Sequence, residues 1–301
     1  MIDQNLYEIY KKRIDDYDET VYFDALEAYG DGNTDMAYIL GLCYILEMGT
    51  ARNVKLGIKY LKEAALKHQN LDAIIALGDA YAGDFGNLIK SKFKEAKKYY
   101  ELADQMGNLR GKSNLGNLFY TNHEYQKGFS LVKEAYDQGY QQDAWLLSRY
   151  YEIGKAVPKD DEAAFKIMMD IKNPGGYELV RIGRMYKNGI GTNIDAEQAF
   201  KYFSAAATLS FAVGMREVGL CFLLGFGTKR RIDLALKYLN LAADHGDFKS
   251  LDILVEINDL GDEKENYDFT TLPILSDDYI ENIMRYLVVK NKLKFTKNNR
   301  Q

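Results

Sequence analysis

The hydrophobic positions of this 301-residue chain follow a repeating helical pattern. A Leu-Gly pair, or a close variant of it, is followed three residues after the glycine by an aromatic residue. The leucine and the aromatic are four residues apart and therefore share one face of a helix. Six copies occur, at Leu40-Gly41 with Tyr44, Leu77-Gly78 with Tyr81, Leu115-Gly116 with Phe119, Leu147-Ser148 with Tyr151, Ile182-Gly183 with Tyr186, and Val218-Gly219 with Phe222. Their Gly or Ser positions lie 37, 38, 32, 35 and 36 residues apart, which predicts a repeat architecture.

A second motif accompanies the first. Eight residues after the Leu-Gly glycine comes a loop glycine, then a tyrosine eleven residues later, then a pair of alanines. The clearest copies are Gly49, Tyr60 and Ala64-Ala65; Gly191, Tyr202 and Ala206-Ala207; and Gly227, Tyr238 and Ala242-Ala243. The second copy has two extra loop residues, the third has lost about four, and the fourth has Met168 in place of the tyrosine.

Each part of the motif has a structural reason. A glycine inside a helix costs about 1 kcal/mol relative to alanine, so its recurrence indicates that a second helix approaches closely there. The loop glycines can adopt positive φ and turn the chain from a first helix (helix A) into a second (helix B). The alanines of helix B offer a shallow surface to the next helix A. One hairpin cannot bury its own apolar face, so we predict an all-α, right-handed α-solenoid of about six stacked helix-turn-helix repeats.

These residues resemble the Sel-one-like repeat family, a branch of the tetratricopeptide repeat superfamily. The family pattern is Leu-Gly, an aromatic, Gly-x-Gly, then Lys-Ala, Tyr and Ala-Ala, and residues 179–207 and 215–243 match it best. The resemblance extends over roughly residues 35–250, and the third and fourth repeats depart from it. It implies an adaptor or scaffold role in assembling or regulating other proteins.

The two ends of the chain read as caps with opposite charge. Residues 1–33 predict acidic N-terminal capping helices at 4–16 and 21–29, and residues 34–250 form the predicted solenoid. Residues 251–301 predict C-terminal capping helices with a basic tail. Residues 1–35 carry ten acids against three bases, whereas residues 282–301 carry six bases and no acid. The helix containing Ile39, Leu42 and Leu46 is apolar all round, so we expect an end helix, either 4–16 or the terminal one, to pack over it.

Composition excludes several classes of protein. A net charge of −5 gives no reason to expect nucleic acid as the main ligand. The first residues lack a basic segment followed by an apolar one, and the longest apolar run, 36–46, is too short to span a bilayer. The two cysteines, Cys43 and Cys221, make no disulfide framework and lack zinc-ligand spacing. We therefore predict a cytoplasmic protein with no membrane segment, no metal and no cofactor.

The candidate catalytic motifs have simpler structural explanations. Gly189-x-Gly191 and Gly225-x-Gly227 resemble part of a dinucleotide-binding loop, but each follows a helix, lacks the third glycine and recurs with the repeat. His68 and His245 both end a helix B, where imidazole can interact with the helix C-terminus. The cysteines occupy equivalent helix A positions, as expected for packing. No nucleophile, base and orienting group come together in the sequence, so we predict no catalysis.

In superhelices of this kind, A helices line the concave surface. With the Leu-Gly glycine as position zero, positions −2, +1 and +5 lie opposite the core stripe. In the middle repeats this face is rich in amide and guanidinium groups, which suit carboxylates and extended peptide backbone. Hence we expect a groove that binds an acidic or C-terminal peptide, and its candidate residues are Asn114, Asn117, Trp145, Arg149, Arg181, Arg184 and Asn188.

The sequence predicts a non-catalytic protein–protein interaction scaffold or adaptor. The alternative is a regulator or inhibitor of one target, of the immunity or anti-defence type, for which the acidic N-terminal helices would suit a basic partner. The identity of the partner and the oligomeric state are not predicted.

Overall fold

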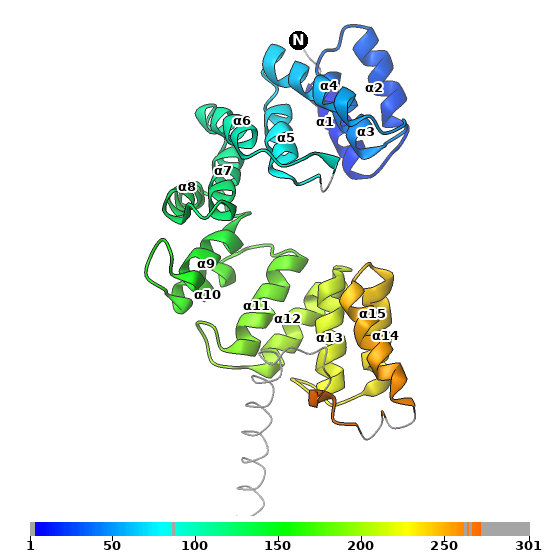
Figure 1. The fold of residues 1–301 in the computed structure, drawn as a ribbon, viewed down its shortest axis with the longest axis vertical. Coiled ribbons are helices and arrows are strands. Elements are labelled where there is room, and N and C mark those ends of the chain that lie inside the picture. Colours follow the sequence, from blue (N-terminus) through cyan, green and yellow to red (C-terminus); the bar gives the residue numbers. More distant parts are fainter. Residues whose placement is uncertain (1–3, 86–87, 262–263, 265–266, 272–301) are drawn as a thin grey trace, which may run out of the picture. The chain divides into compact units, whose positions relative to one another are not determined.

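A computed structural model describes residues 4–85, 88–261, 264 and 267–271. All regular elements within these residues are helical, as predicted (Figure 1). The chain divides into two compact units, Met1–Asp143 (unit 1) and Ala144–Gln301 (unit 2). This division falls between the third and fourth predicted repeats. The predicted terminal helix and basic tail lie outside the described residues.

Unit 1 contains an N-terminal helix pair and the first three predicted hairpins. In each hairpin helix A packs against the helix B that follows it, and helix B packs against the next helix A. The helices are α1 (Gln4–Asp15), α2 (Val21–Gly30), α3 (Met36–Leu46), α4 (Val54–Lys67), α5 (Leu71–Ala82), α6 (Phe93–Gln105), α7 (Leu109–Thr121) and α8 (Tyr125–Asp137).

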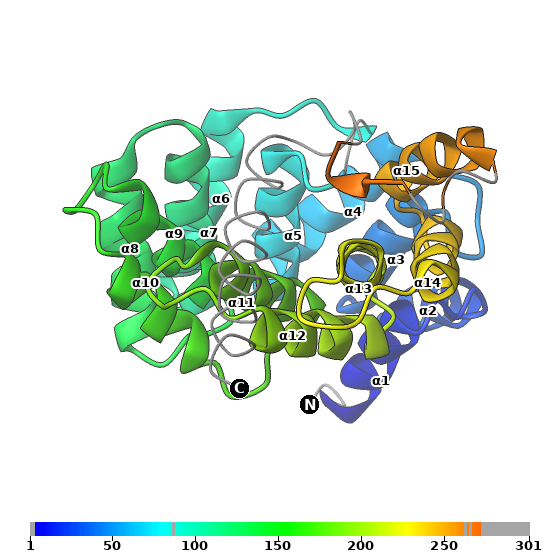
Figure 2. The same cartoon turned by 90° about the horizontal axis from the view of Figure 1, so that it is seen from below.

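Unit 2 contains the next three hairpins and a seventh helix A, and Figures 1 and 2 show its last three α-helices side by side. A short 3₁₀ helix, η3, follows and contacts α13. The elements are α9 (Ala144–Ile153), α10 (Asp161–Met169), α11 (Gly176–Asn188), α12 (Ala196–Thr208), α13 (Ala212–Leu224), α14 (Ile232–Asp244), α15 (Phe248–Asp259) and η3 (Phe269–Thr271).

The Leu-Gly glycines lie where helices A and B approach most closely, as predicted. A Cβ atom at Gly183 would lie 2.5 Å from the ring of Phe203 on α12, and one at Gly219 would lie 2.9 Å from the Leu239 side chain on α14. Real Cβ atoms do not come so near to other heavy atoms. Glycine at these positions therefore lets the two backbones approach and offsets its low helix propensity.

Aromatic rings form a recurring column within the hairpins. The aromatic of helix A stacks on the tyrosine of helix B, with ring centroids 5.8 Å apart for Tyr44–Tyr60 and 5.6 Å apart for Tyr186–Tyr202. Phe165 of the preceding repeat meets Tyr186 edge-on at 5.2 Å, and so links one hairpin to the next. Stacked and edge-on geometries are both favourable for aromatic pairs. The aromatic positions of the motif thus hold the stack together.

The loop glycines contact the preceding repeat, a role that the sequence did not reveal. Gly191 has φ +66° and Gly227 has φ +70°, as expected for the turn. A Cβ on Gly227 would overlap the carbonyl oxygen of Ala196 at the start of α12, and one on Gly191 would overlap that of Asp161 at the start of α10. These glycines therefore serve both the turn and the stacking of neighbouring hairpins.

The N-terminal helix covers the first repeat. Helix α1 packs against α3 and places Tyr7 5.9 Å from the Tyr38 ring, and Tyr7 donates to Asp72 on α5 (3.0 Å). This confirms the predicted packing of residues 4–16 over the apolar helix. Ile39 and Leu42 are buried, whereas Leu46 is 37% exposed.

A buried ion pair joins two A helices of unit 2. Lys187 Nζ on α11 lies 3.7 Å from Glu217 Oε2 on α13, and both side chains are at most 5% exposed. Although burial acts to raise it, the pKa of Glu217 is held below its ordinary value by Lys187 and Arg184. Burial lowers the pKa of Lys187, and the charge of Glu217 opposes that effect.

One part of the predicted concave face is wrong. Positions −2, +1 and +5 of the sixth helix A are Glu217, Leu220 and Leu224, so the rule derived from the sequence predicts them on the open face, but all three are buried. Glu217 is paired with bases from α11, and the two leucines belong to the same apolar cluster as Phe269.

The stacking role of the loop glycines can be tested with two alanine substitutions. Gly246 has φ +86° with no atom near its Cβ position, so Gly246→Ala isolates the cost of a positive φ, about 1–2 kcal/mol. Gly227→Ala adds the overlap with Ala196 and should lower the free energy of unfolding by about 2 kcal/mol more. Urea unfolding of both variants measures the difference, and equal losses would contradict the contact.

The buried Lys187–Glu217 ion pair leads to a second prediction. Glu217→Gln removes the carboxylate that faces the Lys187 ammonium and should destabilise the protein by about 3–5 kcal/mol. Adding Lys187→Met should recover part of this loss, since no buried charge then remains in the pair. The lowered pKa of Glu217 means that its contribution is full above its ordinary pKa and is lost as pH falls through the lowered value. Unfolding curves between pH 3 and 7 should show this loss of stability in the wild type and not in Glu217→Gln. A double variant less stable than Glu217→Gln alone would contradict the pairing.

Candidate functional site

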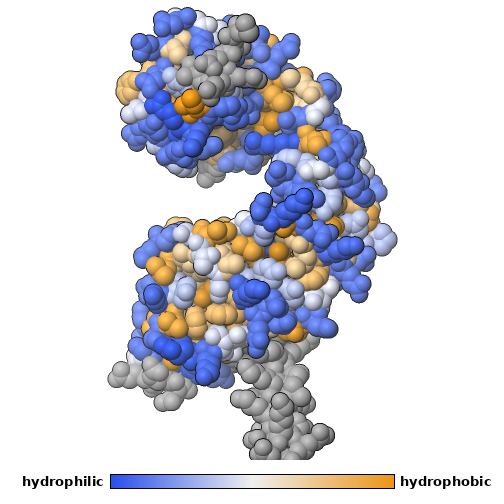
Figure 3. All heavy atoms as spheres, turned by 180° about the vertical axis from the view of Figure 1, so that it is seen from behind, coloured by the Kyte–Doolittle hydropathy of each residue, from blue (hydrophilic) through white to orange (hydrophobic). Residues whose placement is uncertain are grey.

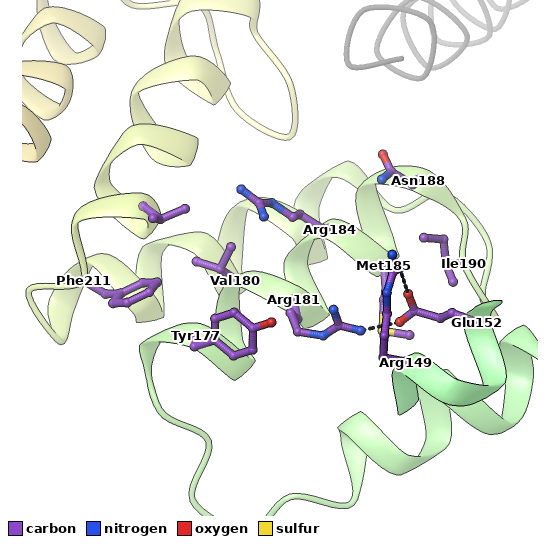
Figure 4. Close-up of a pocket in the computed structure, with 11 residues that line it drawn as sticks. Arg149, Glu152, Tyr177, Val180, Arg181, Arg184, Met185, Asn188, Ile190 and Phe211 are labelled. Carbon is purple, nitrogen blue, oxygen red and sulfur yellow. Dashed lines mark hydrogen bonds and ion pairs between the residues drawn. The ribbon is translucent and has the colours of Figure 1, made fainter. Parts of the chain in front are cut away.

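A pocket of about 260 Å³ opens on the A helices of unit 2. It is formed by α9, α11 and the residues at the start of α13 (Figure 4). Its polar lining consists of Arg149, Glu152, Arg181, Arg184 and Asn188, and its apolar lining consists of Tyr177, Val180, Met185, Ile190, Phe211 and Val213. Four of the seven candidate residues from the sequence therefore meet in one pocket.

The apolar wall depends on a glycine at the start of α11. A Cβ at Gly176 would lie 2.5 Å from Cβ and Cγ of Phe211, the residue that precedes α13. Gly176 therefore leaves room for the Phe211 ring beside α11. Tyr177, the next residue, is 43% exposed. Figure 4 shows Tyr177, Val180 and Phe211 on one side of the pocket and the Arg149–Glu152 pair on the other. On the surface of unit 2, apolar side chains are exposed between hydrophilic ones (Figure 3).

The polar wall is built from guanidinium groups that share carboxylates. Arg149 pairs with Glu152 at 2.9 Å, and Arg181 reaches the other oxygen of the same carboxylate. Arg184 donates from Nε and Nη2 to Oε1 of Glu217, at 2.9 and 2.6 Å. Three guanidinium groups thus face two carboxylates, Glu152 in the lining and Glu217 beside it, which leaves an excess of positive charge at the pocket.

The pairings fix the directions in which these side chains lie. The side chain of Arg181 is 16% exposed, whereas those of Arg149 and Arg184 are 45% and 41% exposed. Arg181 therefore acts as a fixed support within the wall, and the other two guanidinium groups present a large part of their surface to solvent.

In both units, polar contacts between neighbouring A helices join the same two positions of the motif. Arg184 follows its Leu-Gly glycine by one residue, and its partner Glu217 precedes the next such glycine by two. In unit 1, Asp79 and Asn114 hold the same two positions, and the Asn114 amide donates to Asp79 at 3.0 Å. In these two cases position +1 of one helix A faces position −2 of the next. Between α9 and α11 both positions are arginines, Arg149 and Arg181, and Glu152 joins them.

The remaining candidate residues lie outside the pocket. Asn114 and Asn117 belong to α7 in unit 1 and are half-buried. Asp79, the partner of Asn114, also accepts from Tyr100 (2.8 Å) and Arg110 (3.1 Å), and burial raises its pKa. In unit 2, Trp145 contacts the pocket residue Tyr177 edge-on, with ring centroids 5.5 Å apart. Trp145 therefore supports the apolar wall from behind.

The sequence did not identify the apolar wall or Glu152. Tyr177, in the first turn of α11, and Phe211, just before α13, lie ahead of the Leu-Gly motif and carry no periodic signal. Glu152 could have been recognised, since it follows Arg149 by three residues on the same helix, a spacing typical of ion pairs.

Metal binding and thiol chemistry each place specific requirements on the side chains of the described residues. Among the residues with a described placement, no three His, Cys, Asp or Glu side chains cluster in a way that could hold a metal ion. Cys43 and Cys221 are buried, and burial raises the pKa of both thiols, to about 12 for Cys43. The same part of the chain has no helix with the length and apolar character needed to cross a membrane.

Two solved structures resemble the chain. A protective antigen of uropathogenic Escherichia coli strains, which displays an SLR fold, aligns with 85% of this chain and 60% of its own length, with 22% identity and a TM-score of 0.56. A Sel1 repeat protein from Oxalobacter formigenes aligns over 73% of this chain and 96% of its own, with 18% identity and a TM-score of 0.55. At these identities the likeness shows the fold alone.

Two curated relatives share part of the sequence. Both are named "Exopolysaccharide production negative regulator". The protein from Rhizobium leguminosarum bv. viciae is 29% identical over 142 residues, which cover 42% of this chain and 53% of that protein. The one from Rhizobium meliloti is 30% identical over 149 residues, 40% and 56% of the two lengths. The match thus spans about half the length of these relatives.

The repeat pattern itself gives the family. The Sel1 repeat matches residues 34–68, 71–108, 143–168, 179–211 and 212–247, more than half of the chain. These matches include five of the six predicted repeats; the third, whose loop is shortened, is not among them although α7 and α8 form its hairpin. With its repeats matched in sequence and the hairpins of each unit stacked in order, the chain belongs to the Sel1 repeat family.

Proposed function

We propose that this protein is a non-catalytic interaction scaffold that holds a segment of a partner protein against the A helices of unit 2. Sel1 repeats generally mediate protein–protein interaction. The observation that carries the proposal is the half-apolar, positively charged pocket on α9 and α11.

The size of the pocket favours a peptide side chain over a small-molecule cofactor. Sites for small molecules usually have volumes of about 300–1,000 Å³. A pocket of about 260 Å³ suits one anchoring side chain of a longer segment. The rest of such a segment would lie along the helix faces, where Arg149 and Arg184 are partly exposed.

The chemistry of the walls defines the segment further. Tyr177, Val180 and Phe211 would contact an apolar or aromatic side chain, while Arg149 and Arg184 would bind a carboxylate beside it. Guanidinium groups form bidentate bonds with carboxylates, and the Asn188 amide can bond to the peptide backbone. The proposed ligand is therefore an acidic or C-terminal peptide with an apolar residue next to its carboxylate. Asn114 and Asn117 of unit 1 are proposed as further contacts along an extended partner.

The setting we propose is the cytoplasm, with a protein rather than a nucleic acid as the partner. Two free, buried thiols suit a reducing compartment, and a net charge of −5 disfavours nucleic acid.

A second proposal is a regulator that acts on one target. The name of the two curated relatives, negative regulators of exopolysaccharide production, favours it. The acidic residues of α1 and α2 and of the turn between them would suit a basic target surface. A scaffold should be recovered with several proteins in one complex, whereas a single-target regulator should be recovered with one protein in a fixed ratio.

Substitution of two arginines tests the pocket. Arg181→Ala with Arg184→Ala removes two of its three guanidinium groups and should weaken binding of the native partner about tenfold or more, as expected for charge-assisted bonds. The readout is the amount of partner recovered from an extract of the cells that make the protein, measured by quantitative mass spectrometry. Arg52→Ala is the matched control, because Arg52 also pairs with a carboxylate, that of Glu47 at 2.9 Å, but lies between α3 and α4, outside the proposed binding residues.

Circular dichroism must show unchanged helicity in both variants. Unchanged recovery with the double variant, or an equal loss with Arg52→Ala, would contradict binding in the pocket. A peptide array with free and amidated C-termini then separates a terminal carboxylate from an acidic side chain.

A further inference from the structure

The last described α-helix, α15, exposes an apolar stripe. On α15, Phe248, Leu251 and Val255 are 76%, 46% and 58% exposed, and their spacing of three and four residues places them on one face. The opposite face of the same helix is buried through Ile253, Leu254 and Ile257. We call Phe248, Leu251 and Val255 the α15 stripe.

The stripe occupies the place where a helix B would pack. Val255 follows Gly219 by 36 residues, and Leu254-Val255 stands where the other repeats have Leu-Gly. In α13 the backbone of α14 approaches this position, since a Cβ at Gly219 would lie 3.2 Å from the carbonyl oxygen of Ala235. Helix α15 is the seventh helix A, and among the described residues only the short 3₁₀ helix η3, and no α-helix, follows it.

Acidic residues lie along the stripe. Asp252 and Asp259 are exposed and follow Phe248 and Val255 by four residues, so they share its face. A second copy of the chain packed stripe to stripe would bring these acids toward its own acids. The occupant that fits this face is therefore an apolar helix with basic residues.

We propose that the C-terminal segment, residues 272–301, packs its apolar face on the α15 stripe. Its sequence predicts an amphipathic helix from Asp277 to about residue 294, with Ile280, Ile283 and Leu287 at helical spacing. The last twenty residues of the chain contain six bases and no acid, which complements Asp252 and Asp259.

The chain leaves the described part from a fixed point close to α15. η3 contacts α13, the neighbouring helix A, and Phe269 is buried there. Arg230 lies over the Phe269 ring, 5.0 Å from its centroid, and donates to the Tyr267 carbonyl at 2.8 Å. Residues 272–277 can span about 20 Å when extended, and packed helices lie about 8–10 Å apart. The segment can therefore reach the far side of α15.

The contact completes the seventh hairpin with a helix that differs from a regular helix B. Val255 carries the side chain that the repeat glycine lacks, so the segment packs at a greater distance than α14 packs on α13. Such an end covers the apolar core without offering a surface on which an eighth repeat could stack. The covalent link gives the segment a high effective concentration at the stripe, on the order of millimolar.

Hydrogen–deuterium exchange on the full chain tests the contact from both sides. In the wild type, amides 277–294 should exchange at least tenfold more slowly than an unstructured chain. Val255→Asp should abolish this protection, and Ile283→Asp with Leu287→Asp should raise the exchange of α15 amides. Combining Val255→Asp with the two tail substitutions should not raise amide exchange further, because each change already breaks the same contact. Phe23→Asp, at a 62% exposed apolar residue of α2, is the control and should leave both regions unchanged.

Three outcomes would overturn the proposal. The first is a wild-type tail that exchanges at the rate of an unstructured chain. The second is a tail that keeps its protection in Val255→Asp, which would place it elsewhere. The third is a dimer in light scattering that Val255→Asp converts to a monomer, which would make a second copy the occupant. Charge reversal by Asp252→Lys and Asp259→Lys should also lower the tail's protection, and no change would contradict the proposed role of the acids.

Discussion

The close approach of helices A and B at the Leu-Gly glycines is the constraint on which the rest of the fold depends. Because Gly183 and Gly219 carry no Cβ, Phe203 and Leu239 of helix B reach the backbone of helix A. That approach brings the paired aromatics into stacking distance, as for Tyr186 and Tyr202. The loop glycines then allow each hairpin to lie against the start of the previous helix B. Each small residue of the motif therefore marks a contact between helices, and the sequence repeats because the contacts repeat.

Most of the fold could be predicted because its contacts recur at fixed spacing. The six hairpins, the helix pair at 4–16 and 21–29, and the packing of α1 on α3 all follow from apolar periodicity and from glycine and alanine positions. The burial of Glu217 could not be predicted from one helix alone, because it depends on bases that approach from α11. A face that is open on a single helix is covered here because the preceding repeat presents the opposite charge.

The candidate site was predicted in part for the same reason. Arg149, Arg181, Arg184 and Asn188 occupy periodic positions and meet in the pocket. Tyr177, in the first turn of α11, and Phe211, just before α13, lie ahead of the Leu-Gly motif and outside its period. The place of the Phe211 ring beside α11 depends on the absence of a side chain at Gly176. Polar positions of the repeat thus supply the charge of the pocket, and residues at and near the helix starts, which lie outside the motif, supply much of its apolar wall.

The central claim is that a partner segment lies in the pocket of unit 2, with its apolar side chain against Tyr177. The most direct measurement replaces Tyr177 with a photo-crosslinking amino acid and identifies the attached peptide by mass spectrometry. We expect the crosslinked peptide to come from a single partner segment with an apolar residue beside a carboxylate. Capture of the partner from Lys201, an exposed position on helix B, with none from Tyr177, would contradict it.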